Sequence, residues 1–322
     1  MGTKERLLKL LEAEKGRYAS GEEIAQTLCV SRAAVWKAVN ALRQEGYPIE
    51  AATNRGYCLS EKTDVLSGQG IRKALEPDCR NVNITVLPTV GSTNALIREM
   101  AGRGEPEGCA VIAGEQTAGR GRRGRQFYSP KDTGIYMSLL LRPKHCAVEQ
   151  AVSFTSMAAV AMCEAIEAAS GETAQIKWVN DVFVRGKKVC GILTEAALDM
   201  ENGQVEYIVL GAGVNVYPPR DGFPEELKAV AGTVFEELHS DAKNRLAGEF
   251  IRRMMAFYTE PDGYVEKYRA RSLVLGKSVT VLQGESARSA TVCDIDDACR
   301  LLVRYDSGET AYLSYGEIQV RM

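Results

Sequence analysis

The first 60 residues carry a spacing of apolar and polar positions that predicts three short helices. A leucine-rich pattern with the helical period runs over residues 3–14. Ser20 stands three residues before Glu23, a capping box that begins the second helix. Ser31 is the expected N-cap of a third helix that runs to about Glu45. Two short helices joined by a few residues indicate a helix-turn-helix.

Residues 48–59 predict two short strands around the turn Asn54-Arg55-Gly56, which would form the wing of a winged helix. Residues 1–60 hold nine Lys or Arg and seven Asp or Glu, a net charge of +2. The basic groups on the third helix and at the wing tip lie where groove and phosphate contacts fall. A winged helix used only for protein contact is the alternative, and we favour DNA binding. The predicted DNA-binding residues are Ser31, Arg32, Lys37, Asn40, Arg43 and Arg55.

Further along the chain, apolar runs alternate with amphipathic stretches, which predicts an α/β (α+β) domain. A hairpin is expected to turn at Arg185-Gly186. Residues 276–322, broken at Gly284, Asp296-Asp297 and Ser307-Gly308, predict short strands in a small barrel-like β domain. The other expected strands are 83–87, 109–114, 134–141, 190–197 and 205–215, and the expected helices are 69–75, 147–169, 224–231, 242–258 and 261–270.

Composition changes this picture little. The 322 residues are 45% hydrophobic and 25% charged, which is ordinary for a soluble globular protein of two or three domains. A net charge of −2 excludes a polycation, so any nucleic-acid contact must be local. No apolar run approaches the roughly 20 residues that a membrane span needs, and the N-terminus lacks a signal-peptide core.

The cysteines and histidines limit which metal sites, disulfides and catalytic groups the chain can have. Nine cysteines without a Cys-x-x-Cys pair argue against a zinc site or a disulfide framework. They indicate reduced, mostly buried thiols in the cytoplasm. The only histidines, His145 and His239, belong to no recognisable constellation and are expected at the surface. This argues against histidine-based acid–base chemistry.

The segment Gly119-Arg120-Gly121-Arg122-Arg123-Gly124-Arg125 lies between two apolar runs and holds four arginines and three glycines. Adjacent like charges repel, and glycine gives up ordering entropy, so packing does not explain the segment. Glycine lets a backbone close around a ligand, and arginine binds carboxylate or phosphate through two donors. We therefore expect a loop that an anion orders. A basic, solvated or nucleic-acid-binding loop is the alternative.

A second candidate is the turn Ser92-Thr93-Asn94, which joins a predicted strand to a predicted helix. Any one of these residues is more simply explained as the helix cap. Three together at a strand-to-helix turn also present amide and hydroxyl groups to a ligand.

Five segments, in this order, resemble those of biotin–protein ligases, in the bifunctional class that also represses the biotin operon. The similarity spans essentially the full chain. It implies a winged helix-turn-helix over 1–62, a class II synthetase-like mixed-sheet ligase domain over 63–272, and an SH3-like β-barrel over 273–322. The segments are 91–94 (GSTN), 116–125 (QTAGRGRRGR), 177–181 (KWVND), 187–193 (KKVCGIL) and 211–215 (GAGVN).

The resemblance assigns roles to these residues. Lys188 and Arg120 would be catalytic, and Asp181 is a weak candidate metal ligand. The family usually has proline where Val179 stands and often tryptophan where Phe127 stands. The implied biotin-binding residues are Ser92, Thr93, Asn94, Gln116, Gly119, Arg120, Gly121, Arg122, Lys188 and Gly191, and the implied nucleotide-binding residues are Arg122, Arg123, Phe127, Lys177, Asn180, Asp181 and Asn215.

The same resemblance implies an ATP- and Mg²⁺-dependent reaction in the cytoplasm. Biotin's carboxylate attacks the α-phosphate of ATP, and a lysine of a biotin carboxyl carrier protein domain of acetyl-CoA carboxylase takes the acyl group. A homodimer would bind operator DNA of the biotin operon, with biotinyl-5'-AMP as co-repressor, and no membrane would be involved. A ligand-sensing transcription factor without ligase activity and a ligase for lipoate or another acid are the alternatives.

Overall fold

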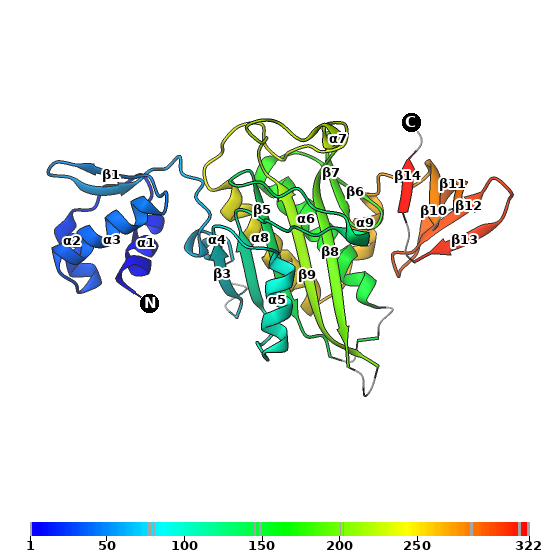
Figure 1. Ribbon diagram of the computed structural model, residues 1–322, viewed down its shortest axis with the longest axis horizontal. Helices are drawn as coiled ribbons and strands as arrows, with labels where there is room; N and C mark the ends of the chain where they lie inside the picture. The colour runs from blue at the N-terminus through cyan, green and yellow to red at the C-terminus, as the bar shows by residue number, and fades with distance from the viewer. Residues whose placement is uncertain are drawn as a thin grey trace. The chain divides into compact units, whose positions relative to one another are not determined.

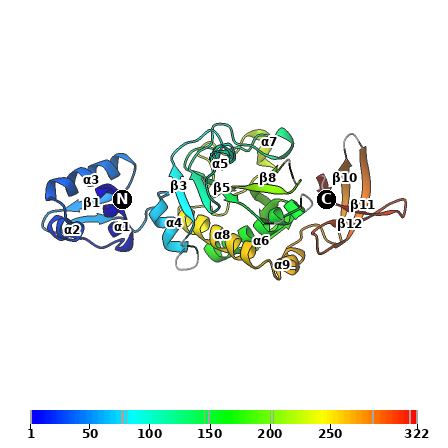
Figure 2. The same cartoon turned by 90° about the horizontal axis from the view of Figure 1, so that it is seen from below.

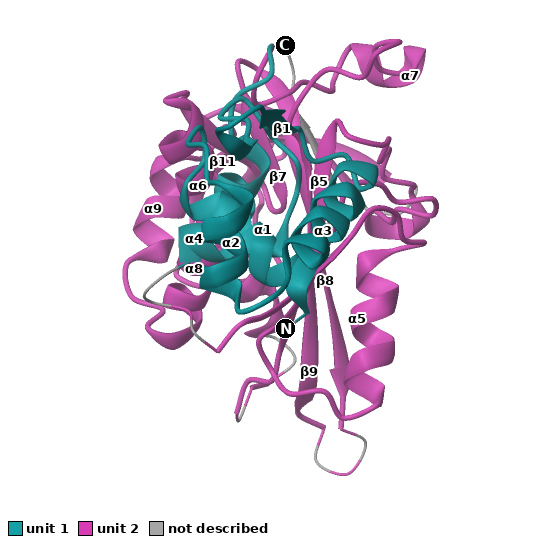
Figure 3. Ribbon diagram, turned by 90° about the vertical axis from the view of Figure 1, so that its left-hand side faces the viewer, with its two compact units in different colours: residues 1–76, 237–248 teal, residues 77–236, 249–322 magenta. Residues whose placement is uncertain are grey.

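The computed structural model describes residues 2–75, 79, 81–144, 146–147, 150–199, 201, 203–283, 286–314 and 317–320. The expectations for His145 and Gly284 lie outside these residues. The chain divides into two compact units, which Figure 3 colours separately: residues 1–76 with 237–248, and residues 77–236 with 249–322.

The helices predicted at the N-terminus are confirmed, together with their caps. Ser20 Oγ accepts from the backbone N–H of Glu23 at 3.1 Å, and Glu23 Oε2 accepts from the N–H of Ser20 at 2.9 Å. Ser31 Oγ accepts from the N–H of Ala34 at 3.2 Å, so Ser31 caps the third helix as expected. The first unit contains α1 (Thr3–Ala13), α2 (Gly21–Leu28), α3 (Arg32–Gln44), the antiparallel hairpin β1 (Ile49–Ala52) and β2 (Gly56–Leu59), and α4 (Gly68–Leu75).

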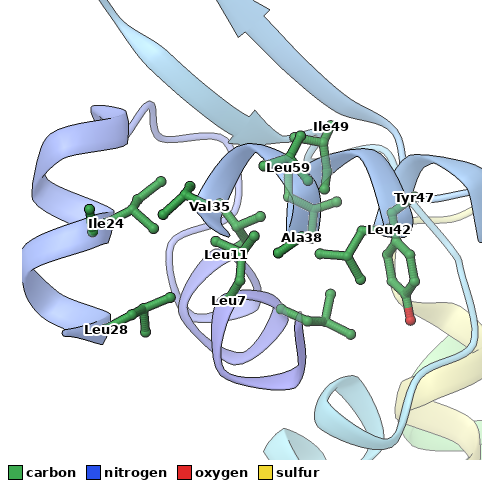
Figure 4. Packing of buried hydrophobic residues seen from close by; sticks show 13 residues of the cluster. Leu7, Leu11, Ile24, Leu28, Val35, Ala38, Leu42, Tyr47, Ile49 and Leu59 are labelled. Carbon is green, nitrogen blue, oxygen red and sulfur yellow. The ribbon is translucent and has the colours of Figure 1, made fainter. Parts of the chain in front are cut away.

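One apolar core holds the three helices and the hairpin together. Figure 4 shows side chains of α1, α2 and α3 converging beneath the strands. Burying side chains of this size contributes about 1.5–3 kcal/mol each before conformational entropy is subtracted. The core residues include Leu7, Leu11, Ile24, Leu28, Val35, Ala38, Leu42, Tyr47, Ile49 and Leu59.

Residues 237–248 belong to this unit through polar contacts. The Lys15 ammonium bridges Asp241 and Glu12, at 2.9 Å from the latter. Burial raises the pKa of Glu12, and the nearby positive charge of Lys15 offsets part of that effect. The side chain of Asn244 accepts from the N–H of Ser67 at 2.9 Å. The start of α8 (Ala242–Thr259) is therefore packed as part of the N-terminal unit.

The second unit is built on a seven-stranded mixed sheet. Its strand order is β3-β4-β5-β9-β8-β7-β6, with one parallel pair, β3 with β4. Helix α5 (Thr93–Gly102) packs on β4, β5 and β9, whereas α6 (Ala151–Ser170) covers the opposite face (Figures 1 and 2). The strands are β3 (Asn83–Leu87), β4 (Cys109–Ala113), β5 (Gly134–Leu141), β6 (Ala174–Lys177), β7 (Asp181–Val184), β8 (Lys187–Leu198) and β9 (Val205–Asn215).

Helix α6 corrects one sequence expectation. Its 20 residues are long and apolar enough to cross a membrane by length and composition, so the statement that no run approaches that length was wrong. The most apolar part of α6 is 61% buried within the protein. Its small residues pack against β6, β8 and β9, as expected of a core helix.

Two helices are shorter than predicted. Helix α7 (Glu225–Lys228) ends early because the backbone at Val230 and Gly232 pairs with Lys188 on β8. Helix α9 (Tyr264–Ala270) begins after Gly263, whose φ of 72° lies in the left-handed region that glycine tolerates.

The C-terminal segment forms a five-stranded antiparallel sheet of order β13-β12-β11-β10-β14. The predicted strands are present, but the pairing among the described residues is that of an open sheet. Trp178, in the turn between β6 and β7, donates through Nε1 to the carbonyl of Cys299 at 2.9 Å. This hydrogen bond connects the C-terminal segment to that turn. The strands are β10 (Ser278–Gln283), β11 (Ser286–Ile295), β12 (Leu301–Tyr305), β13 (Thr310–Leu313) and β14 (Glu317–Val320).

Candidate active site

The Gly/Arg segment forms a tight hairpin between β4 and β5. The N–H of Gly121 donates to the carbonyl of Arg125 at 2.7 Å, and the N–H of Phe127 donates to the carbonyl of Gly119 at 3.0 Å. Arg123 has a φ of 57° at the tip. A Cβ on Gly119 would lie 2.6 Å from both Phe127 O and Ser129 Oγ, so only glycine lets the two limbs approach.

Arg122 is the arginine that this hairpin directs toward β7 and β8. Its Nη1 donates to Asn180 Oδ1 at 2.9 Å, and Asn180 Nδ2 donates to Asp181 Oδ1 at 3.1 Å. The Lys188 ammonium lies 2.7 Å from the same Asp181 oxygen. Lys188 thus contacts the carboxylate directly and Arg122 reaches it through Asn180, so these four side chains together carry a net positive charge suited to an anionic ligand.

Arg120, Arg123 and Arg125 are exposed. The sequence reading made Arg120 a catalytic residue together with Lys188. In the structure Arg122 reaches the pair of Asp181 and Lys188 through Asn180, whereas Arg120 pairs through its backbone with Gln126.

The floor beside this charged group is a pair of glycines. Gly191 on β8 is the register partner of Gly213 on β9. A Cβ on Gly213 would lie 2.5 Å from Cε1 of Phe127, and one on Gly191 would lie 3.1 Å from Cε2. The Phe127 ring therefore rests on backbone, with Tyr136 edge-on at 6.3 Å between ring centroids. Phe127 was assigned to the nucleotide and Gly191 to biotin, and the structure brings the two into contact.

The turn Ser92-Thr93-Asn94 is buried at the start of α5. Ser92 is its N-cap, and its Oγ accepts from the N–H of Ala95 at 3.4 Å, as the capping interpretation expected. Thr93 donates through its N–H to Gln116 Oε1 at 2.9 Å, and its hydroxyl oxygen lies 3.1 Å from the same Gln116 oxygen. Two of the predicted biotin residues are therefore in direct contact.

Two predicted nucleotide residues lie at strand ends. Lys177 on β6 is the register partner of Asp181 on β7. Asn215, at the end of β9, donates through Nδ2 to the carbonyl of Gly232 at 3.1 Å. Asn215 shares a face of β9 with Gly213 because side chains alternate along a strand.

Sequence reasoning missed three polar residues that touch this site: Ser129, Ser138 and Glu195. Ser129 Oγ accepts from Gln116 Nε2 at 3.2 Å, and Glu195 accepts from Asn94 Nδ2 at 2.7 Å. Ser138 is 1% exposed and contacts both Thr93 and Asn94. A serine inside the apolar run 134–141 was the available signal, because buried hydroxyls need partners.

The site contains no activated nucleophile among its described residues. Burial raises the pKa of the Cys190 thiol, which keeps it protonated beside Lys188. Within the described part of the chain, no three His, Cys, Asp or Glu side chains gather as a metal centre. Asp181 is the one carboxylate of the charged group described above.

The face of α3 that points away from the core carries the predicted DNA contacts. Arg32 and Lys37 are exposed, whereas Arg43 Nε donates to the carbonyl of Ile49 at 2.8 Å and fastens the hairpin. The guanidinium of Arg55 stacks 4.1 Å from the ring centroid of Tyr18. Trp36, which the sequence reading passed over, is 59% exposed on α3.

Family models match three parts of the chain: the HTH domain at residues 3–58, the biotin/lipoate A/B protein ligase family at 86–215, and the biotin protein ligase C-terminal domain at 274–321. The chain is 34% identical to the bifunctional ligase/repressor BirA of Bacillus spizizenii, over 94% of each chain. The chain belongs to the bifunctional ligase/repressor family.

Two further proteins are similar to this chain. The bifunctional ligase/repressor BirA of Escherichia coli is 29% identical over 95% of this chain and 94% of its own. Among solved structures, the biotin protein ligase of Aquifex aeolicus in complex with biotin and ATP has a TM-score of 0.61 and 26% identity. It matches 74% of this chain and 98% of its own.

Proposed function

We propose that the chain makes biotinyl-5'-AMP from biotin and ATP, transfers biotin to a lysine of a carrier protein, and represses biotin genes. The observation that carries the proposal is the group formed by Arg122, Asn180, Asp181 and Lys188 beside the contact of Thr93 with Gln116. A site for a carboxylate and a polyphosphate needs concentrated positive charge next to polar groups that orient a neutral ring.

The proposed biotin site comprises Ser92, Thr93, Asn94, Gln116, Gly119, Arg120, Gly121, Arg122, Lys188 and Gly191. The proposed nucleotide site comprises Arg122, Arg123, Phe127, Lys177, Asn180, Asp181 and Asn215. The contact of Phe127 with Gly191 and Gly213 supports one continuous surface for both substrates. Arg122 belongs to both sets because its guanidinium reaches the Asp181 group from the hairpin.

In the first step, a biotin carboxylate oxygen attacks the α-phosphorus of ATP, and pyrophosphate leaves. Both reactants are anions, so their repulsion opposes the encounter. Lys188 and Arg122 neutralise that charge, and Asp181 holds the Lys188 ammonium in place. Asp181 is the residue that would hold a Mg²⁺ ion together with substrate phosphates, since Mg²⁺ is bound by one or two carboxylates plus phosphate oxygens. Such an ion would supply further charge neutralisation at the phosphates.

In the second step, the carrier lysine's amine attacks the acyl carbon of biotinyl-5'-AMP, and AMP leaves. An acyl adenylate is already activated, so the protein needs no covalent intermediate. The protonated Cys190 thiol fits this account. The proposed acceptor is the biotin carboxyl carrier protein domain of acetyl-CoA carboxylase.

The proposed repressor binds the operator as a homodimer. A single helix-turn-helix of net charge +2 makes few phosphate contacts, so alone it binds weakly. Pairing two such modules makes the second contact effectively intramolecular. We propose Ser31, Arg32, Lys37, Asn40 and Arg55 at the DNA and biotinyl-5'-AMP as the ligand that favours the dimer. Arg43 donates to the carbonyl of Ile49, so its proposed part is to hold the β1–β2 hairpin in place beside α3.

The finer architecture belongs to the same proposal. The domains would be a winged helix-turn-helix over 1–62, a class II synthetase-like ligase domain over 63–272 and an SH3-like barrel over 273–322. The proposed compartment is the cytoplasm, which suits free cysteines of which several are buried.

The test of this function is transfer of radiolabelled biotin to a purified carrier domain in the presence of ATP. We expect label on the carrier lysine with biotin and none with radiolabelled lipoate. Transfer of lipoate alone would identify a ligase for another acid. A chain that binds operator in response to biotin but labels no carrier would be a sensor rather than a ligase.

A further inference from the structure

A row of hydrogen bonds leads from Arg98 on α5 and Glu195 on β8 to the proposed biotin site. Arg98 Nη2 lies 2.5 Å from Glu195 Oε1, and Asn94 Nδ2 donates to Glu195 Oε2 at 2.7 Å. Asn94 is 5% exposed, and the side chain of Glu195 is 30% exposed. The Glu195 carboxylate therefore places a negative charge beside the buried polar side chain of Asn94.

The orientation of the Asn94 amide follows from its neighbours. Its Nδ2 faces two groups that only accept hydrogen bonds, the Glu195 carboxylate and the carbonyl of Leu193 at 3.4 Å. Its Oδ1 faces Ser138 Oγ at 2.6 Å. A Cβ on Gly211 would lie 2.1 Å from this Oδ1, so the glycine makes room for the amide against β9.

The orientation of the Asn94 amide also sets the directions of the hydrogen bonds of Ser138 and Thr93. The single hydroxyl proton of Ser138 lies within reach of Asn94 Oδ1 at 2.6 Å and Thr93 Oγ1 at 2.7 Å. Asn94 Oδ1 can only accept, so it takes that proton. The Ser138 oxygen is then left to accept from the Thr93 hydroxyl, and Gln116 Oε1 keeps the Thr93 N–H at 2.9 Å. Thr93 Oγ1 is left with lone pairs for a ligand.

We propose that Glu195 is a positioning residue for biotin. Together with the carbonyl of Leu193 it holds Asn94 Nδ2, and so it fixes the direction of the hydroxyl protons of Ser138 and Thr93, so that Thr93 Oγ1 accepts from an N–H of the ureido ring. This rests on the proposed ligase function, in which Thr93 and Asn94 belong to the biotin site. A purely structural network would stabilise the turn but would not favour one substrate over the other.

Glu195→Gln is the first test. A glutamine amide can donate to Asn94 and reverse the proton order, and it loses the ion pair with Arg98. We expect the KM for biotin in ATP–pyrophosphate exchange to rise about tenfold, the worth of roughly one hydrogen bond. The KM for ATP and kcat should change by less than about twofold. The matched control is Glu99→Gln. Glu99 lies on α5, the helix of Asn94 and Arg98, and the substitution breaks an exposed ion pair with Arg103.

Rescue is the second test. Asn94→Asp sets an acceptor against the Glu195 carboxylate and should raise the biotin KM further. Adding Glu195→Gln to Asn94→Asp supplies a donor opposite the new carboxylate and should lower the biotin KM again. An unchanged biotin KM in Glu195→Gln, or equal increases for biotin and ATP, overturns the proposal, and so does a double variant worse than both single ones.

The two hypotheses fail in different ways. Absence of biotin-dependent exchange in the unaltered protein would refute the ligase function itself. Normal exchange in the unaltered protein with a Glu195→Gln variant identical to the Glu99→Gln control would refute only the positioning role.

Discussion

The Lys188 ammonium lies 2.7 Å from Oδ1 of Asp181, and a hydrogen bond through Asn180 links the same oxygen to Arg122. The ammonium is thus held before substrate arrives, so no reorganisation is needed when charge develops at the phosphate. This relationship makes Lys188 the best candidate for stabilising the transition state.

Lys188→Met should therefore lower kcat for adenylate synthesis by about 10²–10³-fold, the usual cost of losing one donor to a transition-state charge. Lys187→Met is the matched control. It removes the neighbouring lysine, whose ammonium donates to the carbonyl of Ala229 at 2.5 Å and not to Asp181. Single-turnover formation of biotinyl-5'-AMP measures both. Similar losses in the two variants would contradict the role given to Lys188.

Arg122→Gly should release biotinyl-5'-AMP faster than Arg120→Gly does. Arg122 joins the hairpin to the Asp181 group, whereas Arg120 is exposed and pairs through its backbone with Gln126. Removing Arg122 opens that contact while Lys188 still supports the chemistry. Dissociation of the preformed adenylate in a chase experiment gives the two rates. A faster release from Arg120→Gly would restore the sequence assignment of Arg120.

Biotin with ATP should protect the hairpin at 119–125 from trypsin. Its limbs are joined by backbone hydrogen bonds, but Arg120, Arg123 and Arg125 are exposed at trypsin-susceptible positions. An anionic ligand reduces the repulsion among the arginines and favours one conformation. Cleavage rates with and without ligand, measured by mass spectrometry, should differ. Equal rates at saturating ligand would show that the hairpin does not respond.

Much of the fold could be predicted from the sequence where local signals agreed. The caps at Ser20 and Ser31 and the turn at Arg185-Gly186 each satisfy backbone groups within a few residues, so the sequence alone reveals them. The early end of α7 depends on pairing with Lys188 about 40 residues away, which no local pattern records. The pairing of β10 with β14 likewise joins strands from the two ends of the C-terminal segment, which no local pattern records.

The site was predicted as a set of residues rather than as a geometry. Motif order identified Thr93, Gln116, Asp181 and Lys188, which the structure joins in two hydrogen-bonded groups. The contact of Arg122 with Asn180 was hidden, because it depends on which way a hairpin directs successive side chains. Glu195 was hidden because its contact with Asn94 joins residues about 100 positions apart.

Trp36 offers an optical report on DNA binding. The chain has two tryptophans, Trp36 at 59% exposed and Trp178 at 5%. Because Trp36 lies on the outer face of α3, operator DNA should quench its fluorescence and leave that of Trp178 unchanged. Trp36→Ala should abolish the change in signal, and Lys37→Ala should reduce the salt dependence of binding by about one unit of slope. Quenching that persists in Trp36→Ala would place the DNA elsewhere.

Biotin-dependent exchange of labelled pyrophosphate into ATP tests the central claim most directly, because it reports formation of the adenylate without a carrier protein or DNA. We predict exchange that requires both biotin and Mg²⁺, is not supported by lipoate, and falls to background in Lys188→Met with Lys187→Met active. No exchange in the folded, unaltered protein at saturating biotin would contradict the account.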